Sequence, residues 1–343
     1  MNSKIIILKN DAVGDLTHSL QAINNIILNN KDKKIVIYLS ERSKNFSFLI
    51  NNKNITFKII NYDLTLIQKF QLFYFILTNK ISKVYILTPK SFYFLLPPIF
   101  KKIKFYAICM NGPNNYRRPN NFLRKYLFNY VVNDRGATFK RDSSINLQKK
   151  LTNEDNSFVK EIIKLKPVIS EKIEPKLKEK YFFFHLKKKN LDELGWGIEE
   201  LKLLFNKFLQ YTEYVYITKD IEVDDYNQIL KENFNSYDLN TDKYINNSSK
   251  IVFFDNVEGT NLYNIIKYSK KTIAFHGMMT NLASIEQKPV LDLFYVKLSN
   301  LQDYRSLRNS FYEFKPNYEN YDFILPSKDI SKTIRKINFS LKK

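Results

Sequence analysis

The loop after the first apolar run carries residues that could do acid–base chemistry. Residues 9–16 read Lys-Asn-Asp-Ala-Val-Gly-Asp-Leu, and Gly14 can bring the backbone close to a ligand or adopt a positive φ. The carboxylate of Asp15 stands at the start of an expected helix, where it can act as a general base or only cap the helix. Both interpretations are open at this point. The candidate residues of this loop are Lys9, Asn10, Gly14 and Asp15.

A second stretch, in the last quarter of the sequence, has the pattern of an anion site. Residues 272–286 read as a strand, a turn and a helix, and backbone N–H groups at the start of that helix would hold a phosphate without a metal. His276 could bind a phosphate oxygen as imidazolium or a sugar hydroxyl, or it is an ordinary loop histidine. The candidate residues are His276, Gly277, Met278, Met279 and Thr280, the last also through its hydroxyl.

Three consecutive lysines, Lys187, Lys188 and Lys189, follow the apolar run 180–186. One of them could neutralise a departing diphosphate as its negative charge builds. An exposed basic turn explains the same residues equally well. The sequence does not choose among the three, and Trp196 beyond them is expected to pack in the core.

The sequence lacks several motifs that would indicate other chemistry. It has no phosphate loop ending in Gly-Lys-Ser/Thr, no Gly-x-Gly-x-x-Gly, no His-Glu-x-x-His and no Asp-x-Asp pair. Its single cysteine, Cys109, excludes an intramolecular disulfide and a cysteine-based zinc site, and favours a reducing compartment. We therefore expect no metal and no cofactor beyond a co-substrate.

Alternating strands and helices must position these residues. Short apolar runs separated by segments of helical periodicity are typical of βαβ units and parallel sheets, and the pattern starts again after residue 179. The expected strands are 4–8, 34–39, 56–60, 83–87, 180–186, 213–218, 250–254, 272–275 and 290–294, and the expected helices are 16–28, 64–77, 198–211, 262–268 and 280–286. The predicted fold class is α/β, with two doubly wound, Rossmann-like domains.

The length of 343 residues also favours two domains, because one hydrophobic core rarely grows that large. The chain becomes polar between residues 133 and 179, where 153–165 is the one expected helix, and we place the junction near 166–178. The predicted domains are 1–170 and 171–343. Whether the C-terminal helix packs back on the first domain is left open. Ligands of such sheets bind at the carboxyl ends of the strands, which is where the candidate loops lie.

The opening of the chain resembles the lipopolysaccharide heptosyltransferase-like enzymes of glycosyltransferase family 9. The resemblance lies in Ile5–Lys9, in Ala12-Val-Gly-Asp15 and in Leu20-Gln-Ala-Ile23, with Gln21 where the family has Pro. It implies a GT-B fold, two Rossmann-like domains facing across a cleft, in which 1–170 binds the acceptor and 171–343 binds the nucleotide-sugar donor. It also implies that Asp15 is the base that deprotonates the acceptor hydroxyl in an inverting, metal-independent sugar transfer.

Residues 273–290 resemble the donor-binding element of the same family, including the Lys288-Pro-Val290 that follows the helix. By that resemblance the helix start at Gly277 and one of the lysines 187–189 bind the donor diphosphate. The sequence departs from the family at Phe275-His276, where Asp-Thr is common, and at Thr280-Asn281, where the usual His is displaced. Altered donor specificity and lost activity are both compatible with this departure.

A formal net charge of +21 favours anionic partners. The expected partners are a nucleotide-sugar donor and an anionic glycan or glycolipid acceptor of the lipopolysaccharide type. Peripheral contact with the inner face of the cytoplasmic membrane is a hypothesis drawn from the basic aromatic segment 92–104, which a core helix with solvated lysines also explains.

No long apolar segment or signal peptide is evident, so a cytoplasmic protein is predicted. The alternative function is a non-catalytic nucleotide-sugar or nucleic-acid binding protein with a transferase-like fold. Nucleic acid is disfavoured, because the sequence has no zinc finger, RNP-type sequence or basic heptad region.

Overall fold

The chain forms two compact units. In the computed structural model, the first comprises Met1–Val168 and Leu301–Asn317, and the second Ile169–Asn300 and Tyr318–Lys343. The structure describes residues 3–50, 52–111, 119, 121–134, 143–152, 180–220, 225–238, 243–244, 250–255, 257, 259–295, 311, 314–316 and 320–341. The predicted junction 166–178 and the predicted helix 153–165 lie outside these residues.

The first unit is built on a six-stranded parallel sheet with the strand order β3-β2-β1-β4-β5-β6. The order reverses between β1 and β4, so the loops that leave these two strands diverge and open a crevice at their carboxyl ends. The strands are β1 Lys4–Lys9, β2 Lys34–Ser40, β3 Ile55–Ile60, β4 Ile81–Ile86, β5 Lys104–Asn111 and β6 Asn129–Asp134.

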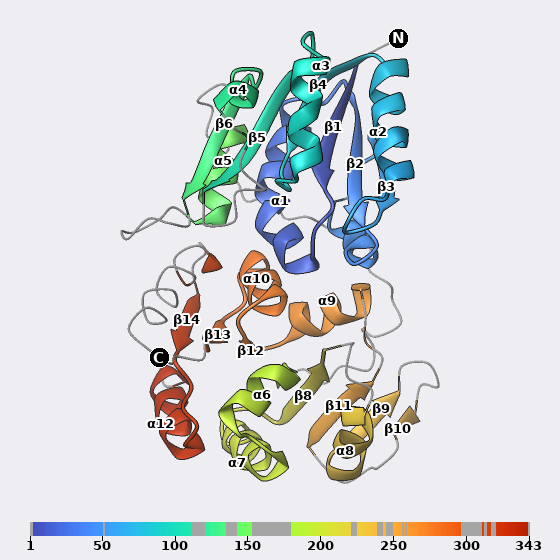
Figure 1. The fold of residues 1–343 in the computed structure, drawn as a ribbon. Helices are drawn as coiled ribbons and strands as arrows, with labels where there is room; N and C mark the ends of the chain where they lie inside the picture. Colours follow the sequence, from blue (N-terminus) through green and yellow to red (C-terminus); the bar gives the residue numbers. More distant parts are fainter. Residues whose placement is uncertain are drawn as a thin grey trace. The chain divides into compact units, whose positions relative to one another are not determined.

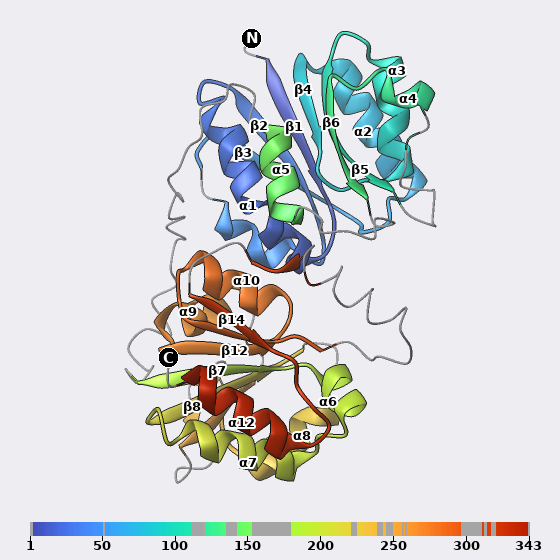
Figure 2. The same cartoon turned by 90° about the vertical axis from the view of Figure 1, so that its left-hand side faces the viewer.

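Helices cover both faces of this sheet (Figures 1 and 2). Helices α1 and α5 pack against each other on one face, and α2, α3 and α4 lie on the other. A capping box starts α2, because Thr65 Oγ1 accepts from the N–H of Gln68 while the Gln68 amide accepts from the N–H of Thr65. The helices are α1 Val13–Leu28, α2 Leu66–Thr78, α3 Leu96–Ile99, α4 Asn121–Arg124 and α5 Ser144–Thr152, with short 3-10 turns η1 Lys44–Leu49 and η2 Ser91–Leu95.

The second unit holds an eight-stranded sheet of order β10-β9-β11-β8-β7-β12-β13-β14. Seven strands are parallel, and only the short edge strand β10 pairs antiparallel, with β9. Here the order reverses between β7 and β12. The strands are β7 Tyr181–Leu186, β8 Tyr214–Lys219, β9 Asn235–Asp238, β10 Lys243–Tyr244, β11 Ile251–Asp255, β12 Lys271–Phe275, β13 Val290–Leu293 and β14 Tyr321–Ile324.

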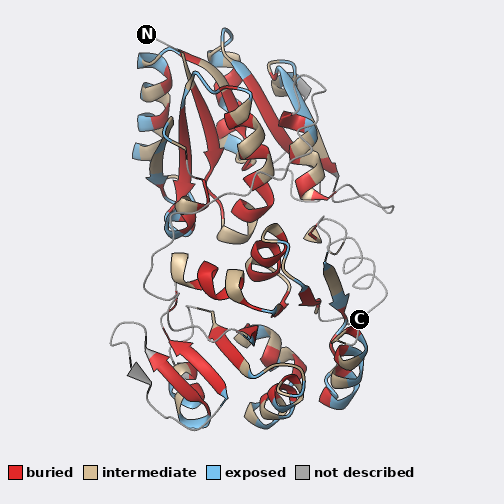
Figure 3. Cartoon of the chain, turned by 180° about the vertical axis from the view of Figure 1, so that it is seen from behind, coloured by how far each residue is buried: buried red, intermediate tan, exposed pale blue. Residues whose placement is uncertain are grey.

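Aromatic side chains fill the core of the second unit, where the strands β7, β11 and β13 are buried along their length (Figure 3). Phe184 packs edge-on against Phe205 and Phe275, and Trp196 is buried beside them. The indole N–H of Trp196 donates to the carbonyl of Ser327 at 3.1 Å, so this side chain packs the core, as expected. The helices are α6 Lys188–Leu194, α7 Ile198–Phe208, α8 Asp225–Asn233, α9 Gly259–Tyr268, α10 Met278–Ile285 and α12 Ile330–Leu341.

The predicted α/β class with two Rossmann-like sheets is confirmed. The expected strands and helices lie within a few residues of the observed ones where the structure describes them. Strands β5, β6, β9, β10 and β14 were not expected, and segment 92–104 is not one core helix but the turn η2, the short helix α3 and the start of β5. The pair Pro97-Pro98 explains the break, because proline is tolerated only in the first turn of a helix.

The C-terminal helix α12 packs in the second unit, against α7 and β14. Ile330 and Ile337 join the aromatic core there. The segment that joins the first unit is instead Leu301–Asn317. Among the helices that the structure describes, none combines the length and the apolar character needed to cross a bilayer.

Candidate functional site

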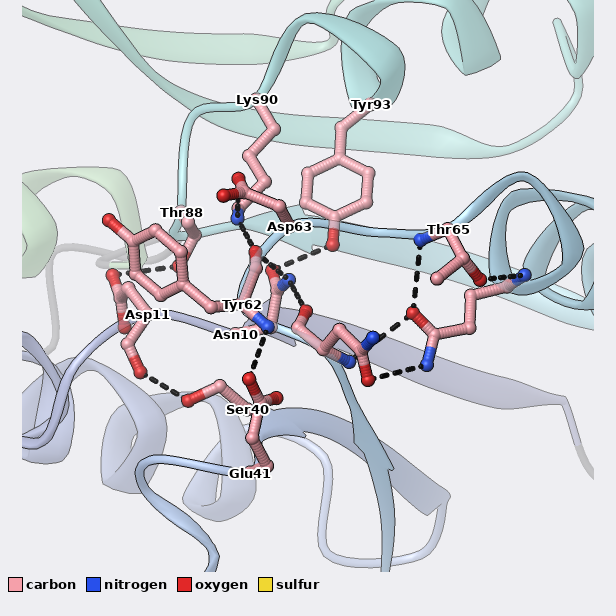
Figure 4. Close-up of polar contacts among 12 residues, drawn as sticks. Asn10, Asp11, Ser40, Glu41, Tyr62, Asp63, Thr65, Thr88, Lys90 and Tyr93 are labelled. Atoms are coloured by element: carbon pink, nitrogen blue, oxygen red, sulfur yellow. Dashed lines mark hydrogen bonds and ion pairs between the residues drawn. The ribbon is translucent and has the colours of Figure 1, made fainter.

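A buried ion pair stands at the reversal point of the first sheet. Lys9, the last residue of β1, places its Nζ 2.7 Å from Asp11 Oδ2, and the Thr88 hydroxyl after β4 donates to the same oxygen at 2.8 Å. The N–H groups of Leu87 and Thr88 both donate to the carbonyl of Leu8, which fixes the two strand ends side by side. Figure 4 shows Asp11 and Thr88 joined in this way.

Burial sets the electrostatics of this pair. Lys9 is 2 % exposed and Asp11 8 %. Loss of hydration raises the pKa of the Asp11 carboxyl, the Lys9 ammonium opposes that rise, and the Asp15 carboxylate adds to it. The second carboxylate oxygen of Asp11, Oδ1, is buried and has no hydrogen-bond partner among the residues described. Asp11 therefore keeps one acceptor that the protein itself does not satisfy.

Asn10 is fully buried and holds the loop in place. Its amide nitrogen donates to the carbonyls of Asn61 and Tyr62 at 3.0 and 3.2 Å, and its amide oxygen accepts from the Tyr93 hydroxyl at 2.7 Å (Figure 4). These bonds tie the loop to the segment before α2 and to η2. Asn10 thus shapes the loop, and both polar atoms of its side chain already have partners.

Asp15 lies in the first turn of α1, two residues after its first residue, and lines the cavity described below. No hydrogen bond of its carboxylate is found within the described part of the chain, so the geometry provides no capping role for it. Gly14 lies in the same turn and has no positive φ, contrary to the conformation considered from the sequence. The helix itself supplies the backbone geometry here, so glycine is not needed for a turn.

A cavity of about 350 Å³ opens over these residues, entirely within the first unit. Three carboxylates and three ammonium groups line it, together with apolar side chains such as Phe92 and Phe314. The charged lining residues are Asp11, Asp15, Asp63, Lys9, Lys69 and Lys90. Such a mixed lining suits a polar ligand that carries hydroxyl groups, because both donors and acceptors are present.

Lys90 closes one side of this cavity. Its ammonium donates to the carbonyl of Tyr62, lies 4.3 Å from the Tyr62 ring centroid and is 3.7 Å from Asp63 Oδ1. The sequence interpretation did not include Asp11, Thr88 or Lys90. The sequence did contain a pointer to Thr88 and Lys90, because both follow β4, the strand that pairs with β1. The loops after two strands that flank a reversal point end at the same crevice.

In the second unit, Lys187 stands at the corresponding reversal point. It follows β7, and its ammonium donates to the carbonyl of His276 at the end of β12. Burial lowers the pKa of Lys187, whereas the nearby carboxylates of Asp220 and Asp292 act to raise it. Lys188 instead pairs with Asp192 and lies over the Tyr226 ring, and Lys189 is exposed on α6. Of the three lysines, the structure brings only Lys187 to the start of α10.

His276 is held by a fully buried carboxylate. Its Nδ1 lies 2.5 Å from Asp292 Oδ2, which also accepts from the Tyr321 hydroxyl at 2.7 Å. Burial and Asp292 together raise the pKa of Tyr321, so its hydroxyl remains a donor. The His276 ring also packs on Phe294. This arrangement fixes the ring, and no hydrogen bond to Nε2 is found among the residues that the structure describes.

Because Gly277 has no side chain, the Lys187 ammonium can lie against the start of α10. A Cβ at this position would lie 2.6 Å from Lys187 Nζ, and its φ of +153° is rare for other residues. The Thr280 hydroxyl accepts from the N–H of Gly277 and donates to its carbonyl, and Thr280 is fully buried. The Gly277 N–H and the Thr280 hydroxyl are therefore bonded to each other in this structure. Met278 and Met279 occupy the first turn of α10, whose N–H groups lack helical acceptors.

His185 is a satisfied histidine in this structure. Its Nδ1 lies 2.8 Å from the Thr218 hydroxyl and its Nε2 3.2 Å from Asp220 Oδ1. Burial lowers the pKa of this imidazole, and Asp220 opposes the effect. His185 thus supports the end of β7, from which Lys187 extends.

No protein-family model matches the chain, and no curated protein matches its sequence. Solved structures do match over nearly the whole length. The ADP-heptose lipopolysaccharide heptosyltransferase II of E. coli is 12% identical with a TM-score of 0.67, and a glycosyltransferase of family 9 from Veillonella parvula is 12% identical with a TM-score of 0.64. Both matches cover 99% of this chain and 98% of the other.

The E. coli heptosyltransferase WaaC, solved with ADP-2-deoxy-2-fluoro heptose, is 10% identical with a TM-score of 0.62, over 99% of each chain. A UDP-GlcNAc 2-epimerase from Methanocaldococcus jannaschii is more distant, at 14% identity and a TM-score of 0.51 over 100% of this chain and 93% of the other. At these identities the likeness establishes the fold, which is the GT-B type of the heptosyltransferases. The resemblance stated from the sequence is thereby confirmed at the level of structure.

Proposed function

We propose that this chain is a glycosyltransferase that moves a sugar from a nucleotide-sugar donor to an anionic glycan or glycolipid acceptor. The observation that carries the proposal is the contact of Lys187 with the start of α10 at the reversal point of the second sheet. A lysine ammonium beside a helix N-terminus is a site for a diphosphate. The likeness to heptosyltransferases over the whole chain supports the same function.

In this proposal the donor diphosphate lies on the first turn of α10. The N–H groups of Met278 and Met279 and the Lys187 ammonium stabilise the negative charge of the leaving group without a metal ion. His276, held by Asp292, presents Nε2 to a phosphate oxygen or to a sugar hydroxyl. Gly277 contributes space, since any side chain there would displace Lys187.

The acceptor occupies the cavity of the first unit. Asp15 accepts the proton of the attacking hydroxyl, because its carboxylate lines the cavity and is not occupied by a helix cap. Attack on the face of the sugar opposite the diphosphate gives inversion at the anomeric carbon. Lys69 and Lys90 suit an acceptor that carries phosphate, and a cytoplasmic reaction on a lipopolysaccharide-type acceptor follows from the same proposal.

A binding protein that has kept the fold and lost turnover is the second candidate. The observation that favours it is the changed donor element, in which the Thr280 hydroxyl closes the helix start. Such a protein would bind the nucleotide sugar and leave it intact. Fold alone does not decide, since a UDP-GlcNAc 2-epimerase shares this architecture.

A thermal-shift screen with ADP, GDP, UDP and CMP and their sugar conjugates tests the proposal, because a ligand that binds only the folded state raises the melting temperature. We expect one nucleoside diphosphate to raise it selectively without added metal. Lys187→Met should remove most of the shift, and Lys189→Met, an exposed lysine two residues on, should leave it unchanged.

Sugar transfer or release from the donor so identified then separates the two candidates. Binding without any turnover would favour the binding protein. If no nucleotide raised the melting temperature and nucleic acid did, the proposed donor site would be contradicted.

A further inference from the structure

Helix α2 is apolar on two sides. Leu72 and Ile76 face the core of the first unit, whereas five large apolar side chains of the same helix are 62–69 % exposed. At about 100° per residue, these five fall within about 100° of one another around the helix axis. They form what is called here the α2 face: Leu66, Ile67, Phe70, Tyr74 and Leu77. An exposed apolar stripe on one helix normally has a partner.

The apolar surface continues onto the neighbouring helical segment. Phe73 of α2 contacts Phe100, directly after α3, with ring centroids 5.1 Å apart, which places α3 beside α2 (Figures 1 and 2). Leu95 and Ile99 on this neighbour are 51 % and 57 % exposed. The patch therefore extends over two elements on one face of the sheet.

The sequence that forms this patch and follows it is basic, although the exposed Asp63 lies three residues before α2. From Leu64 to Asn133 the sequence contains eleven Lys and Arg residues and no Asp or Glu. On the α2 side of the sheet, the Lys58 ammonium lies 3.8 Å from the ring centroid of Phe75. Lys101 and Lys102 after α3 are exposed. Apolar side chains rimmed by lysine stems are typical of surfaces that enter the headgroup region of a bilayer.

We propose that the α2 face, with Leu95 and Ile99, docks the first unit onto an anionic lipid bilayer. The apolar side chains enter the boundary between headgroups and acyl chains, and the surrounding lysines bind anionic headgroups. The helix lies in the plane of the interface, because its 13 residues span only about 20 Å, less than a bilayer core of about 30 Å.

A second copy of this chain fits the same face less well. Pairing two such faces would bring together two copies of a span that has no acidic residue, and like charges oppose that association. An anionic bilayer supplies the opposite charge along with the apolar phase. The inference does not depend on the proposed sugar transfer, since no residue of the α2 face lines the cavity.

Sedimentation of the full chain with vesicles tests the proposal. Vesicles of phosphatidylcholine mixed with phosphatidylglycerol should bind the protein, vesicles of phosphatidylcholine alone should bind it weakly, and added salt should weaken the first interaction. The triple variant Phe70→Ser, Tyr74→Ser, Leu77→Ser should lower the partition coefficient by about tenfold or more, because it removes three side chains from the apolar part of the contact.

The matched control changes three exposed apolar residues of the second unit, Leu203→Ser, Leu325→Ser and Phe339→Ser. It should bind vesicles like the unchanged protein. Equal binding of the α2 triple variant, or no binding of the unchanged protein to anionic vesicles, would overturn the proposal. A concentration-dependent dimer in light scattering that the α2 variant dissociates, without vesicle binding, would assign the face to a second copy instead. Unchanged circular dichroism of both variants ensures that the comparison reports binding.

Discussion

The buried pair of Lys9 and Asp11 is the strongest electrostatic feature of the first unit. One partner alone would leave an unpaired charge in a site where only a few per cent of either residue is exposed. Breaking a buried pair costs about 3 to 5 kcal/mol, less when the remaining group can change its protonation state. Asp11 can do so, because burial already raises the pKa of its carboxyl from the unperturbed value of 3.8.

We expect Lys9→Met to be less stable than the unchanged protein and to lose stability as pH rises. Without the ammonium that opposes it, burial raises the pKa of Asp11 further in the folded state. A raised folded pKa means that the contribution of this group to stability is complete below the unfolded pKa and is lost as pH rises through the folded one. Melting temperatures between about pH 4 and about pH 8 measure this trend.

The double variant Lys9→Met, Asp11→Asn is the control, because no carboxyl is left at the site to titrate. Its melting temperature should fall less with rising pH than that of Lys9→Met, and less than that of the unchanged protein, in which the pKa of Asp11 is already raised. A Lys9→Met variant with the pH profile of the unchanged protein would show that the pair does not control the site.

Asp15 is tested by a change that keeps its shape. Asp15→Asn should lower the rate of sugar transfer by about a hundredfold or more, since a positioned general base contributes about 10² to 10⁴. The melting temperature should change little, because the carboxylate makes no hydrogen bond within the described residues. Turnover with the donor found by the thermal-shift screen is the measurement.

Asp63 provides the comparison for Asp15, because it lines the same cavity and its side chain is 94 % exposed. Asp63→Asn should keep most of the activity. If Asp15→Asn and Asp63→Asn transferred sugar at similar rates, Asp15 would not be the base.

At the scale of single elements, the start of α10 depends on one glycine. Two features are combined at Gly277: an unusual φ and the space that the Lys187 ammonium occupies. The helix is only eight residues long and its first turn is closed by Thr280, so its geometry is set by the residues at its start.

Gly277→Ala should weaken nucleotide binding by about tenfold or more, since the new Cβ moves the Lys187 ammonium away from the diphosphate site. The fold should survive, because the atom displaced is the end of a flexible side chain. Isothermal titration with the nucleotide identified by the screen measures the change.

A control at Gly195 tells the effect of backbone strain apart from the effect of displacing the Lys187 side chain. It ends α6 with a φ of +70°, and a Cβ there would meet no atom within 4 Å. Gly195→Ala should therefore cost about 1 kcal/mol of stability and leave nucleotide affinity unchanged. If Gly277→Ala and Gly195→Ala lost the same affinity, displacement of Lys187 would not explain the loss in Gly277→Ala.

At the scale of the whole molecule, each of the two units has buried apolar cores of its own. Leu72 lies in the core on the α2 side of the first sheet, and Leu204 in the aromatic core of the second unit. Both are almost completely buried, so truncation to alanine should cost about 2 to 5 kcal/mol in the unit concerned.

Calorimetry should therefore show a lowered transition for the first unit in Leu72→Ala and for the second unit in Leu204→Ala. A nucleotide that binds at Lys187 should raise the transition that Leu204→Ala lowers. Identical effects of the two truncations, with the nucleotide shifting one common transition, would mean that the units unfold together.

The sequence by itself determined the α/β class, the two sheets and the loops that end β1 and β12. These features are local, because strand and helix periodicity and the Gly-Asp and His-Gly turns are properties of neighbouring residues. The same reasoning missed β5, β6, β9, β10 and β14. One of its two interpretations of 92–104 was a core helix, whereas the chain folds there into η2, α3 and the start of β5.

Only the tertiary structure selected Lys187 among three adjacent lysines and joined Asp11 to Thr88, 77 residues away. It also revealed that one side of α2 is exposed, since an apolar sequence on both sides of a helix does not say which side the core covers. Hydrogen bonds and burial between distant segments depend on how strands are ordered in a sheet, and that order is not encoded in the periodicity of any one segment.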